Sequence, residues 1–166
     1  LNSIQNYILK NDIDKSSDYL SKFGRLMRQI LNNSQSGLIS LRDELDALNL
    51  YINLELMRFR NSFKYHFELD ENIDMEKILV PPLIIQPYVE NAIHHGLRTK
   101  EGEKNLKVLI VKKNKLIYIT IEDDGIGRDE AVKIKERKGN IYKPLGTEIT
   151  EKRLHLFREV YKNKIK

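Results

Sequence analysis

The chain has 166 residues, of which 40% are hydrophobic and 32% charged, and it contains no cysteine. Its length suits one medium domain or two small ones with a buried core. The lack of cysteine excludes disulfides and thiolate metal sites. No apolar run reaches the roughly 18 residues that a membrane span needs, and no signal peptide is visible. Because the first residue is Leu1 rather than Met, we expect a longer protein, with any membrane segments outside these residues.

The net charge of +5 is unevenly distributed. The first 80 residues carry 10 basic and 12 acidic side chains, whereas residues 81–166 carry 19 and 12. A basic second half could attract an anionic ligand or nucleic acid. However, the lysines are scattered and no aromatic residues are interleaved with them as in sequences that stack on bases. A solvated basic surface without a nucleic-acid partner is therefore expected.

Three helices are predicted in roughly the first third of the chain, and the second and third are amphipathic. Residues 1–10 read as the end of a helix, and a second helix spans about 16–33 after a cap at Asp14 or Ser16. A third runs from Ser40, in a sequence similar to a capping box, to about Arg60. Their apolar positions are Leu20, Phe23, Met27, Ile30 and Leu31, then Leu41, Leu45, Leu48, Ile52, Leu56 and Phe59. Such a hairpin needs a partner surface, which is either a second copy or the rest of this chain.

A half-buried strand is predicted at residues 63–69, where apolar and polar residues alternate. His66 would then face solvent or a neighbouring strand. Residues 106–111 and 116–122 are predicted to form a hairpin of two further strands. The second strand runs directly into Asp123-Asp124-Gly125-Ile126-Gly127, where glycine lets the backbone approach a flat or phosphorylated ligand.

The stretch from Pro81 to Leu97 predicts a helix with one apolar and one polar side. Its apolar positions are Leu83, Ile84, Ile85, Tyr88, Val89 and Ala92. On the other side, spacings of three and four residues place Asn91, His94 and His95 next to one another, with Glu90 nearby. These groups suit a metal and an anionic ligand, although spacing alone gives equal weight to an ordinary surface helix.

Further along the chain, residues 128–137 are predicted to form a short helix and residues 138–144 a mobile loop. Gly146 and Thr147 then open a last helix at about 148–162. A glycine at a helix N-terminus favours phosphate, because free N–H groups and the helix dipole both attract an anion. Each glycine motif alone is weak. Their order is more specific: a Glu-Asn helix, a strand ending in D-x-G-x-G, then a loop and a glycine-led helix.

That order resembles the GHKL superfamily of ATP-binding proteins, which includes gyrase, Hsp90, histidine kinases and MutL. More narrowly, QPYVENAIHHGL is similar to the N box of LytS/YehU-type sensor histidine kinases, EDDGIGRDEA to their G1 box and PLGTEITEKRL to their G2 region. The first 60 residues resemble the family's dimerisation and phosphoacceptor region. The resemblance covers almost the whole chain.

The resemblance implies roles for particular residues. Asn91 corresponds to the Mg²⁺ ligand, and Glu90, beside it, to a catalytic position without a firm role. His94 corresponds to a phosphate contact and His95 to a ring against the adenine. Asp123 would accept a hydrogen bond from the adenine amino group. Gly125 and Gly127 would lie near the base, and Gly146 and Thr147 at the phosphate end of a lid.

Two features depart from the family pattern. The phosphoacceptor histidine of the family lies in a motif just before the segment that begins LNS, so it is expected outside these residues. His66, His94, His95 and His155 do not fit its place. The G2 region also has one glycine, Gly146, where many relatives have two, which concerns lid closure more than binding.

The predicted fold is α+β: a GHKL-type α/β sandwich at 62–166, preceded by an α-helical hairpin at 1–61. The predicted function is the ATP- and Mg²⁺-binding part of a sensor histidine kinase. Its partners would be a response regulator and a second copy bound through the N-terminal helices. We expect this part to be cytoplasmic and free of membrane contact, within a protein of the inner membrane. Two alternatives are a hydrolytic GHKL ATPase, disfavoured by Pro87 at the general-base position, and a non-enzymatic dimerisation module with a retained pocket.

Overall fold

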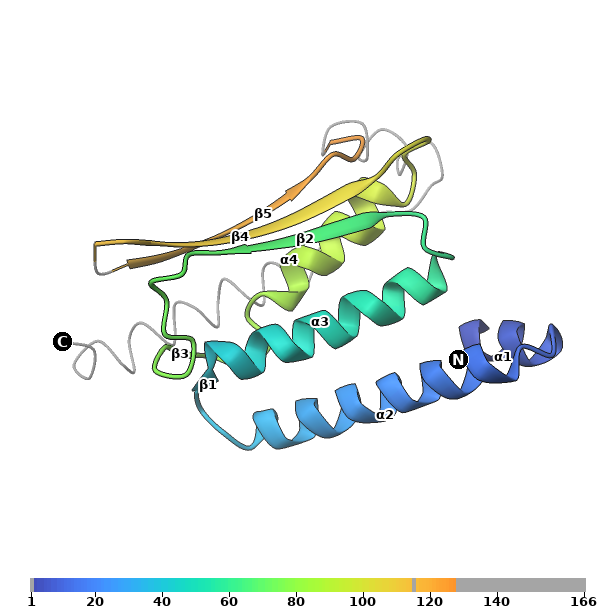
Figure 1. Ribbon diagram of the computed structural model, residues 1–166, viewed down its shortest axis with the longest axis horizontal. Helices are drawn as coiled ribbons and strands as arrows, with labels where there is room; N and C mark the ends of the chain where they lie inside the picture. The colour runs from blue at the N-terminus through green and yellow to red at the C-terminus, as the bar shows by residue number, and fades with distance from the viewer. Residues whose placement is uncertain (1, 115, 128–166) are drawn as a thin grey trace, which may run out of the picture. The chain divides into compact units, whose positions relative to one another are not determined.

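The computed structural model describes residues 2–114 and 116–127, which contain both helices and sheets (Figure 1). The chain divides into two compact units, one of residues 1–64 and 72–83 and the other of residues 65–71 and 84–166. The mixture of helix and sheet confirms the α+β class. The GHKL type of sandwich and the functional division near residue 61 stay predictions.

Three helices make up most of the first unit: α1 (Asn2–Leu9), α2 (Ile13–Ser34) and α3 (Leu41–Arg58). The predicted cap of α2 was wrong, because Asp12 caps this helix by accepting the backbone N–H of Lys15 at 3.2 Å. An aspartate one residue before the helix satisfies a free N–H of the first turn, so the helix begins earlier than its apolar pattern. The predicted cap of α3 is confirmed, since Ser40 Oγ accepts the Asp43 N–H at 3.0 Å.

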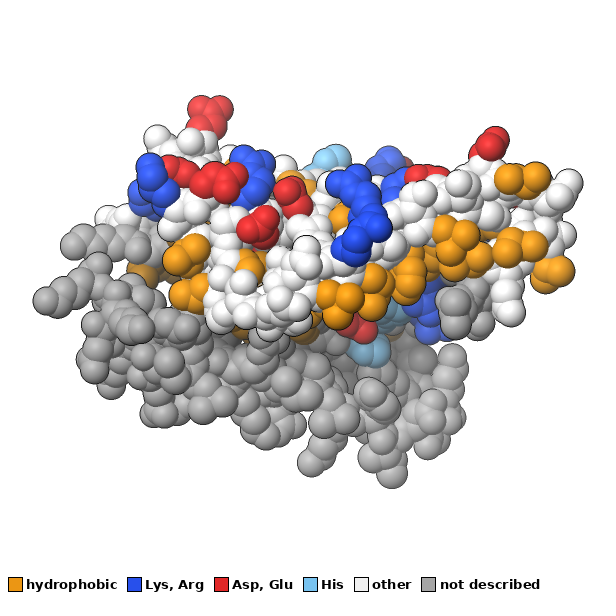
Figure 2. Space-filling model, turned by 90° about the horizontal axis from the view of Figure 1, so that it is seen from below, with side chains coloured by type: hydrophobic (Ala, Val, Ile, Leu, Met, Phe, Trp, Pro, Cys, Tyr) orange, Lys and Arg blue, Asp and Glu red, His pale blue; other side chains and the backbone are white. Residues whose placement is uncertain are grey.

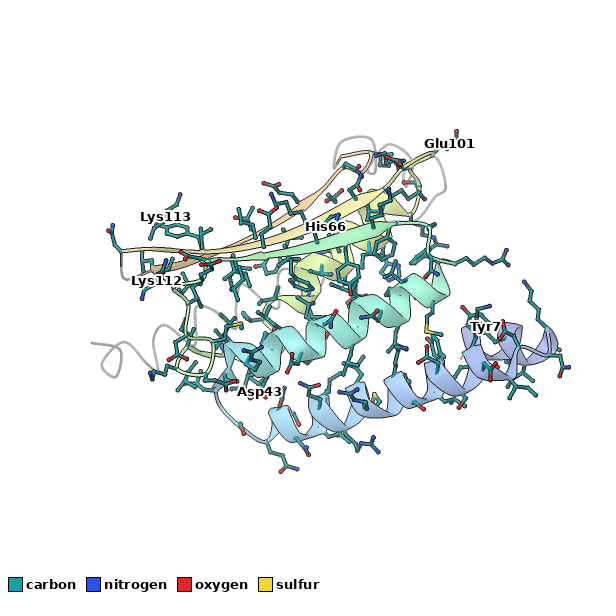
Figure 3. The ribbon with its side chains drawn as sticks, viewed as in Figure 1. Tyr7, Asp43, His66, Glu101, Lys112 and Lys113 are labelled. Atoms are coloured by element: carbon teal, nitrogen blue, oxygen red, sulfur yellow. The ribbon has the colours of Figure 1, made fainter. Side chains whose placement is uncertain are left out.

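The core of this unit lies between α2 and α3. One cluster of this core contains the buried residues Tyr19, Leu26, Ala47 and Leu54. Near the C-terminal end of α3, the Tyr7 hydroxyl donates a hydrogen bond of 2.6 Å to the Met57 carbonyl and so joins α1 to α3 (Figure 3).

The apolar side chains that the sequence placed at helical spacing on α2 lie mostly on its surface. Leu20 is 50% exposed and Leu31 58%, and Phe23 and Met27 are also exposed. Figure 2 shows hydrophobic side chains in a row along the α1–α2 side of the chain. The residues that face α3 are instead Tyr19 and Leu26, seven positions apart. The helix therefore has two apolar faces, and one of them is not used within the described part of the chain.

A pair of two-residue strands joins two distant segments of the first unit. Strand β1 (Ile39–Ser40) pairs antiparallel with β3 (Leu79–Val80). Three residues after β3, Leu83 has a φ of 56°, a conformation that is rare for a bulky residue. Its N–H donates to Glu44 Oε2 at 2.7 Å, and Glu44 is only 1% exposed.

The second unit contains a three-stranded sheet in the order β2-β4-β5, formed by β2 (Lys64–Leu69), β4 (Asn105–Lys113) and β5 (Leu116–Asp123). The predicted hairpin is confirmed: β4 and β5 are antiparallel, with Leu106 opposite Asp123 and Lys113 opposite Leu116. His66 on β2 is exposed, as predicted (Figure 3).

The helix that covers this sheet begins later than predicted. Helix α4 (Gln86–Asn91) continues into a π-helical turn, η1 (Ala92–Leu97), and the residues from Pro81 to Ile85 precede it. The left-handed Leu83 cannot belong to an α-helix, which explains the late start. The helical segment and the residue before it bury side chains four residues apart: Ile85, Val89, Ile93 and Leu97. Strand β4 buries the alternate residues Leu106, Val108 and Ile110.

Candidate nucleotide site

The predicted ligand-binding residues of the first motif lie where the helix changes its winding. In η1 the Arg98 N–H donates to the Ile93 carbonyl at 3.0 Å, which spans five residues instead of four. Such π-turns are often found at functional sites, and the sequence predicted an ordinary α-helix here. Asn91, His94 and His95 are half-buried, whereas Glu90 is exposed.

The second predicted motif follows β5 and meets this turn. The Gly125 N–H donates to Asp123 Oδ1 at 3.0 Å, and the Ile126 N–H donates to the Gly96 carbonyl at 3.4 Å. The D-x-G-x-G turn is thus bonded to the end of η1. The structure therefore brings the two predicted motifs, near residues 91–97 and 123–127, into contact.

Two glycines make this approach possible. A Cβ built on Gly96 would lie 2.1 Å from Asp123 Oδ1, and a Cβ on Gly125 would lie 2.3 Å from the Gly96 carbonyl carbon. Both distances are too short for any other residue without movement. Gly127 is needed for a different reason, since its φ is 77° and its surroundings are open.

Asp124 has a structural role that the sequence analysis missed. Its carboxylate accepts the Asn105 backbone N–H at 2.8 Å and the Asn105 side-chain amide at 2.7 Å. Lys100 forms an ion pair with it at 2.9 Å. Desolvation works to raise the pKa of Asp124, but the bonds from Asn105 and Lys100 outweigh it and lower the pKa from 3.8 to about 2. The residue connects the end of β5 to the start of β4 and to the loop before it.

The neighbouring Asp123 has a different environment. It is exposed, and its Oδ1 is fixed by Gly125 while the side chain lies against Gly96. An exposed carboxylate with one oxygen held in place is suited to accept a hydrogen bond from a ligand amino group at the other oxygen. The nearby glycine backbone allows a flat ring to approach. These features fit an adenine base.

Asn91 is the described residue of the predicted site that suits a magnesium ion bound together with phosphate. Within residues 2–114 and 116–127, no three His, Asp or Glu side chains converge on a cation-sized site. The amide oxygen of Asn91 is a suitable hard ligand, but a magnesium ion there would need phosphate and water oxygens as well. The predicted phosphate residues Gly146 and Thr147, and the predicted loop 138–144, lie outside the described residues.

Comparison with known proteins agrees with the class of protein that these motifs indicate. The family model described as "Histidine kinase" matches residues 1–63. The chain is 37% identical over 118 residues to the YwpD protein of Bacillus subtilis (strain 168), which covers 70% of this chain and 41% of YwpD. It is 29% identical over 120 residues to the sensor protein LytS of Staphylococcus epidermidis (strain ATCC 12228), which covers 72% of this chain and 20% of LytS. The sensor protein LytS of Enterococcus faecalis is 26% identical over 140 residues, 84% of this chain and 23% of that protein.

These matches support a histidine kinase by class. The family-model match and the LytS relatives support the LytS-type sensor histidine kinase family for this chain. It spans less than half the length of these relatives. Among the helices of the described residues, none is both long and apolar enough to cross a membrane.

Proposed function

We propose that this chain is the part of a sensor histidine kinase that binds ATP and Mg²⁺ and delivers the γ-phosphoryl group to a histidine. The observation that carries the proposal is the exposed Asp123 carboxylate, held by Gly125 and seated on the backbone of Gly96. A carboxylate in this geometry can accept a hydrogen bond from an exocyclic amino group of a base. Family membership favours adenine as the base that carries this group.

Each residue of the site has a distinct task in this proposal. Asp123 accepts the adenine amino group, and His95 supports the ring. Asn91 holds a magnesium ion that neutralises the phosphate charge, and His94 contacts a phosphate. Glu90, which is exposed next to Asn91, orients it or a metal-bound water. Phosphoryl transfer then depends mainly on positioning and on charge neutralisation.

The acceptor of the phosphoryl group is proposed to lie outside the 166 residues. A phosphoacceptor must reach the γ-phosphate in line, from an element that can move. His94 and His95 are half-buried in η1 beside the proposed ligand, which suits binding better than reception. From the phosphohistidine, the group would pass to an aspartate of a response regulator.

A homodimer through the N-terminal helices completes the proposal. The exposed apolar positions Ile13, Leu20 and Met27 are seven residues apart on α2, with Phe23 and Leu31 beside them. This is the spacing of a helical packing seam. A second copy of α2 is therefore the partner that we propose for this face.

The binding part of the proposal can be tested by titration calorimetry with ATP and magnesium. Asp123→Asn should weaken binding by about 1–3 kcal/mol, because an amide in place of the carboxylate pairs poorly with the adenine amino group. Glu101→Gln, in an exposed loop, is the control and should bind like the wild type (Figure 3). Equal affinity of the wild type and Asp123→Asn would contradict the assignment.

The hydrolytic alternative predicts a different outcome. Pro87, in the first turn of α4, occupies the position of the general base in that class of ATPase and cannot accept a proton. Steady release of phosphate from ATP should therefore stay near the background rate. Brisk release that Asn91→Ala abolishes would favour the ATPase instead.

A further inference from the structure

Gly96 and Gly125 face each other across the contact between η1 and the turn after β5, but their neighbours differ in kind. The three atoms nearest to a Cβ on Gly125 would be backbone atoms of Gly96, at 2.3–2.5 Å. The three atoms nearest to a Cβ on Gly96 would belong to the Asp123 side chain, at 2.1 Å for Oδ1, 2.8 Å for Cγ and 3.3 Å for Oδ2. Backbone yields with difficulty, whereas a carboxylate at the end of an exposed side chain can rotate away.

We infer that Gly96 is a positioning residue for base recognition. The Asp123 carboxylate occupies the space left by the missing Cβ of Gly96, and this space, the seat, fixes the direction in which the carboxylate faces. This inference rests on the proposed nucleotide site. The seat is completed by the Gly125 N–H, which holds Oδ1 at 3.0 Å, and by the bond of 3.4 Å from the Ile126 N–H to the Gly96 carbonyl. A methyl group at position 96 would fill the seat and turn the carboxylate away from the base.

The inference separates recognition of the base from stability of the fold. The atoms nearest to a methyl group at position 96 belong to the exposed Asp123 side chain, which can rotate, so we expect Gly96→Ala to fold with nearly wild-type stability. Binding of ATP should weaken about tenfold, which is the effect expected for one lost hydrogen bond to a charged acceptor. Inosine triphosphate lacks the amino group that Asp123 reads, so its affinity should change by less than about twofold.

The decisive measurement is a double-mutant cycle in which calorimetry gives the affinity of each variant for each nucleotide with magnesium. In an Asp123→Ala background the carboxylate is gone, and Gly96→Ala should then have almost no further effect on ATP. Gly24→Ala is the matched control, because a Cβ there has nothing within 4 Å. Thermal melting of each variant checks that it is folded.

The possible results are distinguishable. If the wild type binds neither nucleotide, the proposed function fails. If the wild type prefers ATP and folded Gly96→Ala keeps that preference, the proposed function stands and the role of Gly96 is overturned. Equal losses for ATP and inosine triphosphate, or additive effects with Asp123→Ala, would show a merely structural role and would also overturn it.

Discussion

Two adjacent aspartates at the end of β5 have opposite environments. Asp123 offers its carboxylate to the outside, whereas Asp124 accepts bonds from Asn105 and Lys100. An ionised Asp124 therefore stabilises the folded state, and Asp123 is available for a ligand. The same residue type thus has a structural use at position 124 and a proposed ligand-binding use at position 123.

The acid sensitivity of the fold should depend on Asp124. Its pKa lies below the usual value, at about 2 instead of 3.8. Its stabilising effect is present above about pH 4 and is lost as the pH falls toward about 2. Asp124→Asn should lower stability at neutral pH and flatten the decline between these values, as measured by urea unfolding at several pH values. Because the group is partly exposed, the effect should be modest.

Glu101→Gln is the control for this measurement, since Glu101 is also an acid of this region but lies exposed in the loop before β4. Its stability should follow the wild type at every pH. Identical pH profiles for the wild type and Asp124→Asn would contradict the role of Asp124.

At this scale the sequence indicated the two motifs that meet in the structure, but not the contacts between their residues. Asp123, Gly125 and Asn91 were identified by motif, and the structure places Asp123 and Gly125 against the end of η1. The bonds of Asp124 to Asn105 and Lys100 join residues about twenty positions apart, and no local pattern reports them. Its position next to Asp123 at a strand end was the only available signal.

Among the elements of the first unit, the segment after β3 is held to α3 by one buried acid. Glu44 Oε2 accepts the N–H of Leu83, whose backbone is in the left-handed region. Glu44→Ala should lower the free energy of unfolding by about 1–3 kcal/mol, because the amide donor loses its partner. Urea unfolding would measure this change.

Two variants serve as controls for Glu44→Ala. Glu44→Gln keeps an acceptor at the same place and should retain most of the stability. Asp46→Ala, at an exposed position of the same helix, should change stability little. An equal loss in Glu44→Ala and Asp46→Ala would contradict the anchoring role.

The element predictions failed where a tertiary contact outweighed the local pattern. The apolar spacing of α2 indicated one face of the helix, whereas α3 packs against Tyr19 and Leu26, which the spacing did not single out. The helix at 81–97 was predicted in one piece, because neither the left-handed Leu83 nor the π-turn has a signature in apolar spacing. The hairpin of β4 and β5 was predicted correctly, since alternation reports a strand directly.

At the scale of the whole molecule, we predict self-association through α2. Replacing Leu20 and Met27 by Glu puts two charges into the proposed seam and should shift the chain to a monomer in sedimentation experiments. Arg25→Glu, also exposed on α2 but outside the apolar row, is the control and should sediment like the wild type. A wild-type chain that is already monomeric at high micromolar concentration would contradict the dimer.

Because of the exposed row of apolar side chains on α2, the stability of the fold should also depend on the protein concentration. If a second copy covers Leu20, Phe23, Met27 and Leu31, association favours the folded state by mass action. The melting temperature of the wild type should then rise with each tenfold increase in protein concentration, and that of the doubly charged variant should not. A signal that changes the pairing of two such helices would therefore also change the stability of each copy.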